Sequence, residues 1–284
     1  MLGLPELPAK VMGGGSMNTF EPKKHLGQHW LYDESTLESI CDGVAVDSGD
    51  NVLEIGPGLG TLTARLLKRG ARVTAIEFDA NLAAGLSLNI AKLPLEADMS
   101  KLTVVCQDIL SFDLRTMPSG YKVVANIPYY LTSKLLRTLS ESSNPPSCCV
   151  LLIQREVAVR VCAAPGQMSI LAATTQFYFE CRLGIFVPAK LFTPPPKVDS
   201  QVLILAKRAK PYFDLDTKKF FGLIKSGFGE KRKILRNSLS GGLGIPKPDI
   251  DELLKKASIL PSARAQELSL DDWKKIYDVW CEIA

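Results

Sequence analysis

The amino-acid sequence predicts an α/β protein with a doubly wound parallel sheet that closes on a β-hairpin, followed by a small all-helical domain. Two observations carry this prediction. Over residues 35–163, short apolar segments typical of strands alternate with amphipathic segments typical of helices. Beyond residue 208 only helical patterns follow. The alternation favours a parallel sheet with helices on both faces, and the change near residue 208 marks a second unit.

The elements of the sheet follow in order along the chain. Strands are expected where short apolar runs end on a glycine, an acidic residue or an amide, at 50–56, 72–79, 102–108, 121–126 and 148–154. Helices are expected where apolar residues recur at helical spacing, at 35–46, 61–70, 81–93, 131–140 and 155–163. Two longer alternating segments, 177–187 and 197–208, are separated by a loop without a helix, so they predict a hairpin at one edge.

The C-terminal part reads as four short helices with no clear strand, at 216–228, 230–242, 247–259 and 269–283. The segment GGGSM at 13–17 has the composition of a flexible linker, and Met17 is a candidate start. We therefore expect three parts: residues 1–16 as a linker or non-native extension, 17–209 as the sheet domain, and 210–284 as the helical domain.

Composition indicates a soluble globular protein, because 46% of the residues are hydrophobic and 23% are charged. No apolar run reaches the ~20 residues that a membrane helix needs, and the N-terminus lacks the pattern of a secretory signal. The seven cysteines form no CxxC pair, which favours a reduced, cytoplasmic location. His25 and His29 are four residues apart, but no cysteine or acidic partner completes a metal site, so no metal is expected.

Positive charge is concentrated in one short segment. Residues 207–240 hold ten Lys or Arg and three Asp or Glu, a net charge of +7, whereas the net charge is −1 before this segment and −2 after it. A solvated helix face would explain such a cluster. A concentrated basic patch is also the feature expected of a protein that binds a polyanion.

The segment LEIGPGLGTLT at 53–63 predicts a cofactor loop between a strand and a helix. Gly56 and Gly58 allow the backbone to approach a ligand closely, and Glu77, at the end of the next strand, can hold ribose hydroxyls. Glu54 would repel a pyrophosphate and suit a cationic ligand, which favours S-adenosylmethionine over a dinucleotide. Asp108, at the end of the third strand, can accept from the adenine amino group or simply cap the strand end.

The segment NIPY at 126–129 ends the fourth strand at the same edge of the sheet. Turn chemistry alone would explain an amide and a proline there. If the methyl acceptor is the exocyclic amine of a base, the Asn126 side-chain oxygen and the Ile127 carbonyl can accept its N–H groups. Pro128 stiffens the loop, and Tyr129 can stack on a base that has left its helix. The four residues together therefore predict a clamp for a nucleobase.

Taken together, these motifs resemble the ribosomal RNA adenine N6,N6-dimethyltransferase family from about residue 22 to the end of the chain. The matching segments, in family order, are KKHLGQHWLYD, EIGPGLGTLT, QD at 107–108, NIPYYLTS, QREVAVRV and FTPPPKVDSQV. The resemblance implies a Rossmann-like methyltransferase sheet, with 17–209 as the S-adenosylmethionine-binding catalytic domain. It also implies cofactor contacts from His29, Leu31, Gly56, Glu77, Asp108 and Asn126, and a sandwich of the target adenine by Tyr129 and Phe192. The sequence departs from the family at His29, where asparagine is usual, and at Trp30, where phenylalanine is usual.

Two branches of this family share the same core. One dimethylates two adjacent adenosines in a hairpin near the 3′ end of small-subunit ribosomal RNA, and the other modifies large-subunit RNA and gives macrolide resistance. The segment 227–239 resembles the RNA-contacting helix of the small-subunit branch, which implies RNA contacts from Lys231, Arg232, Lys233 and Arg236. We therefore expect a monomer that acts on small-subunit ribosomal RNA within an immature subunit. A non-catalytic RNA-binding relative and a methyltransferase for protein or small-molecule amines remain alternatives.

Overall fold

A seven-stranded mixed sheet forms the centre of the N-terminal domain. The computed structural model describes residues 22–23, 27–230 and 233–283. The strands lie in the order β4-β3-β2-β5-β6-β9-β7. Their bounds are β2 Asn51–Ile55, β3 Arg72–Glu77, β4 Leu102–Cys106, β5 Lys122–Asn126, β6 Cys148–Gln154, β7 Phe179–Val187 and β9 Ser200–Lys207. All seven strands were predicted, each within a few residues of its observed bounds.

Strands β2 to β6 run parallel, and β7 and β9 form the predicted antiparallel hairpin at one edge. Because the parallel strands are covered on both faces, adjacent residues of one strand pack in different hydrophobic clusters. Val52 packs in the cluster on one face of the sheet, and Leu53 packs in the cluster on the other. This explains why the strands read as continuous apolar runs and not as alternating patterns.

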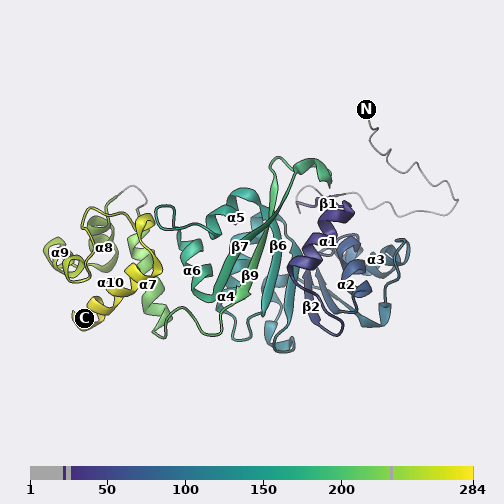
Figure 1. The fold of residues 1–284 in the computed structure, drawn as a ribbon, viewed down its shortest axis with the longest axis horizontal. Coiled ribbons are helices and arrows are strands. Elements are labelled where there is room, and N and C mark those ends of the chain that lie inside the picture. Colours follow the sequence, from purple (N-terminus) through teal and green to yellow (C-terminus); the bar gives the residue numbers. More distant parts are fainter. Residues whose placement is uncertain (1–21, 24–26, 231–232, 284) are drawn as a thin grey trace.

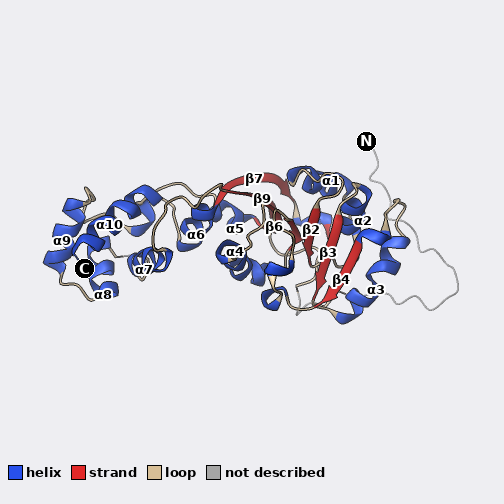
Figure 2. Cartoon of the chain, turned by 90° about the horizontal axis from the view of Figure 1, so that it is seen from below, coloured by secondary structure: helices blue, strands red, loops and turns tan. Residues whose placement is uncertain are grey.

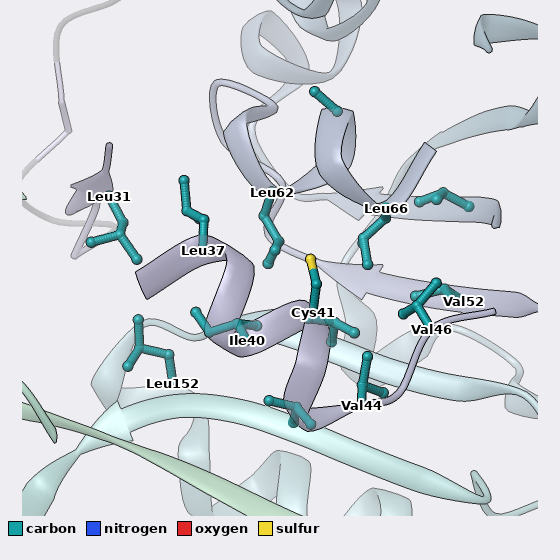
Figure 3. Close-up of a cluster of buried hydrophobic side chains, with 14 of the residues drawn as sticks. Leu31, Leu37, Ile40, Cys41, Val44, Val46, Val52, Leu62, Leu66 and Leu152 are labelled. Carbon is teal, nitrogen blue, oxygen red and sulfur yellow. The ribbon is translucent and has the colours of Figure 1, made fainter. Parts of the chain in front are cut away.

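Helices α1 (Glu34–Gly43), α2 (Thr61–Lys68) and α3 (Ala80–Ala91) cover one face of the sheet, and α4 (Thr132–Glu141) and α5 (Arg155–Val161) cover the other (Figure 1). Leu37 and Cys41 of α1 point toward Leu62 and Leu66 of α2, while Ile40 faces the sheet (Figure 3). The helical spacing of these apolar side chains is the reason that α1 lies flat across the strands.

The expected strand at 177–187 is wrong at its start, because Phe177 and Tyr178 end a helix that the sequence analysis missed. This helix is α6 (Ile170–Tyr178), and strand β7 begins only at Phe179. The Phe177 ring is fully buried and lies 5.6 Å and 5.2 Å, between centroids, from the rings of Phe220 and Phe221. The helix begins after Ser169, whose side chain accepts from the backbone N–H of Ala172, so this N-cap residue is a sequence signal that could have indicated the helix.

Among the described residues of the C-terminal domain, four α-helices lie near the four predicted segments: α7 (Thr217–Gly227), α8 (Leu235–Leu243), α9 (Lys247–Lys256) and α10 (Leu270–Ile283). They pack around the fully buried Trp273 and lie beyond the β7 end of the sheet (Figure 2). One face of α6 contributes to the same core and so connects the two domains. In the described part of the chain, no helix has the length and apolar character needed to cross a membrane.

A second, two-stranded sheet was not predicted. Strand β1 (Trp30–Leu31) pairs antiparallel with β8 (Phe192–Thr193), so that Leu31 lies opposite Phe192. Strands of two residues leave almost no periodic signal in a sequence. The pairing matters because it fixes the segment before α1 next to the loop that joins β7 to β9.

Candidate active site

A crevice opens at the carboxyl edge of the parallel strands, where three chain segments converge. Gly56 follows β2, Glu77 ends β3 and Asn126 ends β5, and all three residues line this crevice. Neighbouring parallel strands bring their carboxyl ends to the same edge of a sheet, which is where ligands of such folds bind. The predicted cofactor loop and the predicted nucleobase clamp therefore lie in one site.

The glycine loop takes a backbone form that side chains would disturb. Gly58 has φ 57° and Gly60 has φ 84°, in the left-handed region that favours glycine. A Cβ atom on Gly60 would lie 2.6 Å from Cγ1 of Ile90, so this glycine allows the start of α2 to pack on α3. The backbone N–H of Gly58 donates to Oε2 of Glu77 at 3.2 Å, and this bond joins the glycine loop to the end of β3.

Glu77 lies at the junction of two chambers of the crevice. The first chamber contains the glycine loop and Asn126, and the second extends toward Asp108. Glu77 is only 7% exposed, and its Oε1 accepts from the backbone N–H of Asp79 at 2.9 Å. Burial raises the pKa of the Glu77 carboxyl. A carboxylate in this position can accept hydrogen bonds from ligand hydroxyls in either chamber.

The second chamber has an acidic wall and aromatic rims. Asp108 lines it and also accepts from the backbone N–H of Leu110 at 2.9 Å, so the residue both caps a turn and faces the chamber. Phe78 and Tyr130 line both chambers and are 61% and 65% exposed. Exposed aromatic rings at the mouth of a crevice offer flat surfaces for a purine.

Glu54 is buried at the base of the first chamber, 1% exposed. Burial raises the pKa of its carboxyl to about 8. Within the described residues, its Oε2 atom has no hydrogen-bond partner. Glu54 is therefore not the permanent anion that its sequence suggests, because burial favours the protonated carboxyl until a cation enters the chamber.

The NIPY segment places its polar groups in the first chamber. Asn126 Nδ2 donates to the backbone carbonyl of His29 at 3.1 Å, which leaves Oδ1 on the other side of the amide. The Tyr129 hydroxyl and Ser200 Oγ are hydrogen-bonded at 2.9 Å, and this contact orients the half-buried ring along the crevice. Ile127 donates its N–H to Leu152 and is buried, while Pro128 lines both chambers.

The segment before α1 covers the first chamber and is tied down at several points. His29 Nδ1 is hydrogen-bonded to the carbonyl of Pro194 at 2.7 Å, and the Leu31 carbonyl accepts from Thr61 Oγ1 at 3.0 Å. Lys23 Nζ lies 2.7 Å from a carboxylate oxygen of Asp79. His29 and Leu31 thus lie at the site as the sequence suggested. The link from His29 to the loop around residue 194 carried no sequence signal.

Phe192 does not lie with the other predicted site residues. Its ring is 3% exposed and packs in the core cluster that contains Leu31, and it lines neither chamber. The pairing of β1 with β8 holds it there. The stacking role predicted for Phe192 therefore requires its ring to leave this cluster.

The basic segment also differs from its expected form. Lys231 and Arg232 lie outside the described residues. Lys233 precedes α8, which begins at Leu235, so the helix expected at 230–242 does not include Lys233. Lys233 Nζ lies 2.6 Å from Glu230, and Arg236 Nη2 lies 2.7 Å from Asp251 of α9. Within α8, Arg236 therefore already has an acidic partner in the same part of the protein.

The geometry defines the class of the protein. A seven-stranded mixed sheet with an antiparallel hairpin, a glycine loop after β2 and an acidic residue ending β3 is typical of the methyltransferase fold. In the ranges described, no group of three His, Cys, Asp or Glu side chains could hold a metal ion. The chain belongs to the ribosomal RNA adenine dimethylase family, which it matches over residues 19–281.

Individual proteins that are similar in sequence or structure support membership of this family. Ribosomal RNA small subunit methyltransferase A of Dehalococcoides mccartyi (strain CBDB1) is 38% identical over 277 residues, covering 96% of this chain and 93% of the relative. The crystal structure of the 23S rRNA methyltransferase ErmE superposes with a TM-score of 0.70 at 27% identity, covering 88% of this chain and 98% of that one. A dimethyladenosine transferase from Plasmodium falciparum superposes with a TM-score of 0.71 at 24% identity, covering 87% and 96%, and shows the shared fold.

Proposed function

We propose that this chain transfers methyl groups from S-adenosylmethionine to N6 of two adjacent adenosines in the 3′-end hairpin of small-subunit ribosomal RNA. The observation that carries the proposal is that Asn126 lines the same chamber as the glycine loop and Tyr129. The small-subunit substrate is favoured over the large-subunit one because the relative named for the small subunit is 38% identical, whereas ErmE is 27% identical.

The residues of the crevice fit the cofactor. S-adenosylmethionine supplies an electrophilic methyl group and carries a ribose, an adenine and a zwitterionic amino-acid end. Glu77 would accept from the ribose hydroxyls, and Asp108 of the second chamber would accept from the adenine amino group. The buried carboxyl of Glu54 suits an ammonium group, because a cation there would favour its charged form.

The acceptor amine needs alignment more than a strong base. Its lone pair is delocalised into the adenine ring, so the free amine is a poor nucleophile. Asn126 Oδ1 and the Ile127 carbonyl would accept its two N–H groups and favour the pyramidal nitrogen at the moment of attack. Tyr129, held by Ser200, would stack on the face of the extruded base.

The C-terminal domain would provide further binding contacts to the RNA. The basic segment around Lys231, Arg232, Lys233 and Arg236 would contact phosphates, which position a substrate without reading its sequence. We propose that the enzyme works as a cytoplasmic monomer on an immature small subunit, where the hairpin is still accessible. The +7 charge of residues 207–240 supports such a partner.

The test maps methyl groups on RNA. Small and large ribosomal subunits from cells that lack the gene are incubated separately with the purified protein and labelled S-adenosylmethionine, and the label is located by mass spectrometry of RNA fragments. We expect two dimethylated adenosines, adjacent in the 3′-end hairpin, and no label with Asn126→Ala under the same conditions. Label on large-subunit RNA alone would favour the alternative branch, and no label on any RNA would contradict the proposal. Parallel reactions with protein-free RNA identify the substrate form.

A further inference from the structure

The indole of Trp30 carries a buried hydrogen-bond donor with nothing to bond to. Its Nε1 atom is shielded from solvent and has no hydrogen-bond partner in residues 22–23, 27–230 and 233–283. A buried N–H group left unpaired costs free energy comparable to a lost hydrogen bond. Because the atom is shielded even in the empty crevice, the indole must shift slightly before a ligand can reach its N–H group.

The position of the indole is defined by the cofactor loop. Trp30 lines the first chamber, and a Cβ atom on Gly58 would lie 3.4 Å from its Cδ1 atom and 3.6 Å from its Nε1 atom. The N–H edge therefore lies against the glycine loop. Trp30 does not line the second chamber, where Asp108 lies. The two other tryptophans, Trp273 and Trp280, belong to the C-terminal domain.

The same chamber holds an unpaired acid. Glu54 is 1% exposed, and its Oε2 atom has no partner in the part of the chain that the structure describes. A chamber with one unsatisfied donor and one unsatisfied acid complements a ligand that carries both signs of charge. An amino-acid end, with its ammonium and its carboxylate, has this character.

We propose that the indole N–H of Trp30 donates a hydrogen bond to the carboxylate at the methionine end of the bound cofactor. This inference rests on the proposed function, because it takes S-adenosylmethionine as the ligand. The carboxylate is the only anionic acceptor in that molecule, and a charge-assisted bond in a buried site is stronger than one to a neutral oxygen. Trp30 is thus a cofactor-binding residue that acts on the end of the cofactor remote from adenine.

The test compares two cofactors and two variants by calorimetry. The ligands are S-adenosylmethionine and its decarboxylated form, and the variants are Trp30→Phe and, as matched control, Trp280→Phe. We expect Trp30→Phe to weaken binding of S-adenosylmethionine roughly ten-fold or more, because a hydrogen bond to a charged group is lost. Binding of the decarboxylated compound changes little in Trp30→Phe, and Trp280→Phe binds both compounds like the wild type.

An equal loss for the two ligands means that Trp30 acts only through packing and overturns the inference, as does an unchanged affinity for S-adenosylmethionine. A wild-type protein that binds neither compound contradicts the proposed function itself, so the two failures are distinguishable. A measurement on the wild type avoids any folding defect of the variant. In ¹⁵N-labelled protein, the Trp30 indole resonance should move downfield with S-adenosylmethionine and stay nearly in place with the decarboxylated compound; the reverse pattern overturns the inference.

Discussion

Asn126 and His29 are joined by a hydrogen bond of 3.1 Å between the side-chain amide of the first and the backbone carbonyl of the second, 97 residues earlier in the chain. This bond connects the nucleobase clamp at the end of β5 with the segment that covers the cofactor chamber. It also fixes the direction of the amide, because the nitrogen donates to His29 and the oxygen must then point away from it. The contact thus leaves Asn126 Oδ1 free of this bond, as the proposed role in holding a substrate amine requires.

Replacement of Asn126 by alanine should slow methyl transfer more than it weakens RNA binding. In the proposed mechanism the amide acts on the attacking nitrogen, so its contribution would belong mainly to the transition state. We expect a loss of roughly a hundred-fold or more in the single-turnover rate, as for other preorganised polar groups of active sites. RNA affinity, measured by filter binding, should stay close to that of the wild type. Equal single-turnover rates would remove Asn126 from the reaction.

Glu54 gives a prediction about pH and stability. Its pKa rises from 4.5 in the free side chain to about 8 in the folded protein, because the site is buried. Between these values the folded state holds a proton that the unfolded state has released, so this group makes the free energy of unfolding fall as pH rises, and the effect is complete above about pH 8. Glu54→Gln lacks this dependence and should gain stability relative to the wild type as pH rises. Urea unfolding of both proteins across this range measures the difference, and parallel pH profiles would contradict the assignment.

Tyr129→Ala should impair use of the RNA substrate by ~1–3 kcal/mol in kcat/KM, the scale of one lost stacking face. Tyr129→Phe should retain most of the activity, since the ring remains and only the bond to Ser200 is lost. Steady-state kinetics with small subunits as substrate provides the comparison. If Tyr129→Phe is as impaired as Tyr129→Ala, the hydroxyl and not the ring is the important group.

Phe192→Ala should behave differently, because the ring is buried in the core. Removal of a buried phenylalanine side chain leaves a cavity and lowers the free energy of unfolding by ~3–5 kcal/mol. Urea titration with circular dichroism detects this change, and the half-exposed Tyr129→Ala serves as the control with a smaller loss. A variant at residue 192 with normal stability and low activity would show that the ring spends most of its time outside the core.

Replacement of Arg236 and replacement of Asp251 should change RNA affinity differently, which allows a test of the basic segment. Arg236→Ala should weaken RNA binding and reduce the slope of log affinity against log salt by roughly one, the value for a single phosphate contact. Asp251→Ala breaks the same 2.7 Å ion pair but frees the cation, so its RNA affinity should rise or stay unchanged. Titrations at several salt concentrations separate the two effects. Identical slopes for Arg236→Ala and the wild type would mean that this charge serves only the contact between α8 and α9.

The sequence alone was sufficient to predict the sheet and the cofactor loop, because each depends on the composition of a short segment of the chain. The run NVLEI at 51–55 shows a buried strand through its own composition, and Glu77 shows the end of the next strand through its position before a new helix. Once parallel strands are expected, their carboxyl ends must meet at one edge. Gly56, Glu77 and Asn126 could therefore be assigned to one site without coordinates.

Only the tertiary structure decided the features that depend on residues distant in sequence. Phe177, near the end of α6, packs against Phe220 and Phe221, and Phe192 is buried where its strand pairs with the strand of Leu31. In each contact the two partners lie more than forty residues apart in the sequence, so a local pattern cannot indicate that they meet. The charge of a buried side chain likewise depends on residues that are distant in sequence. Glu54 reads as an anion in the sequence, but the surrounding protein removes the water that would stabilise its charge and so raises its pKa.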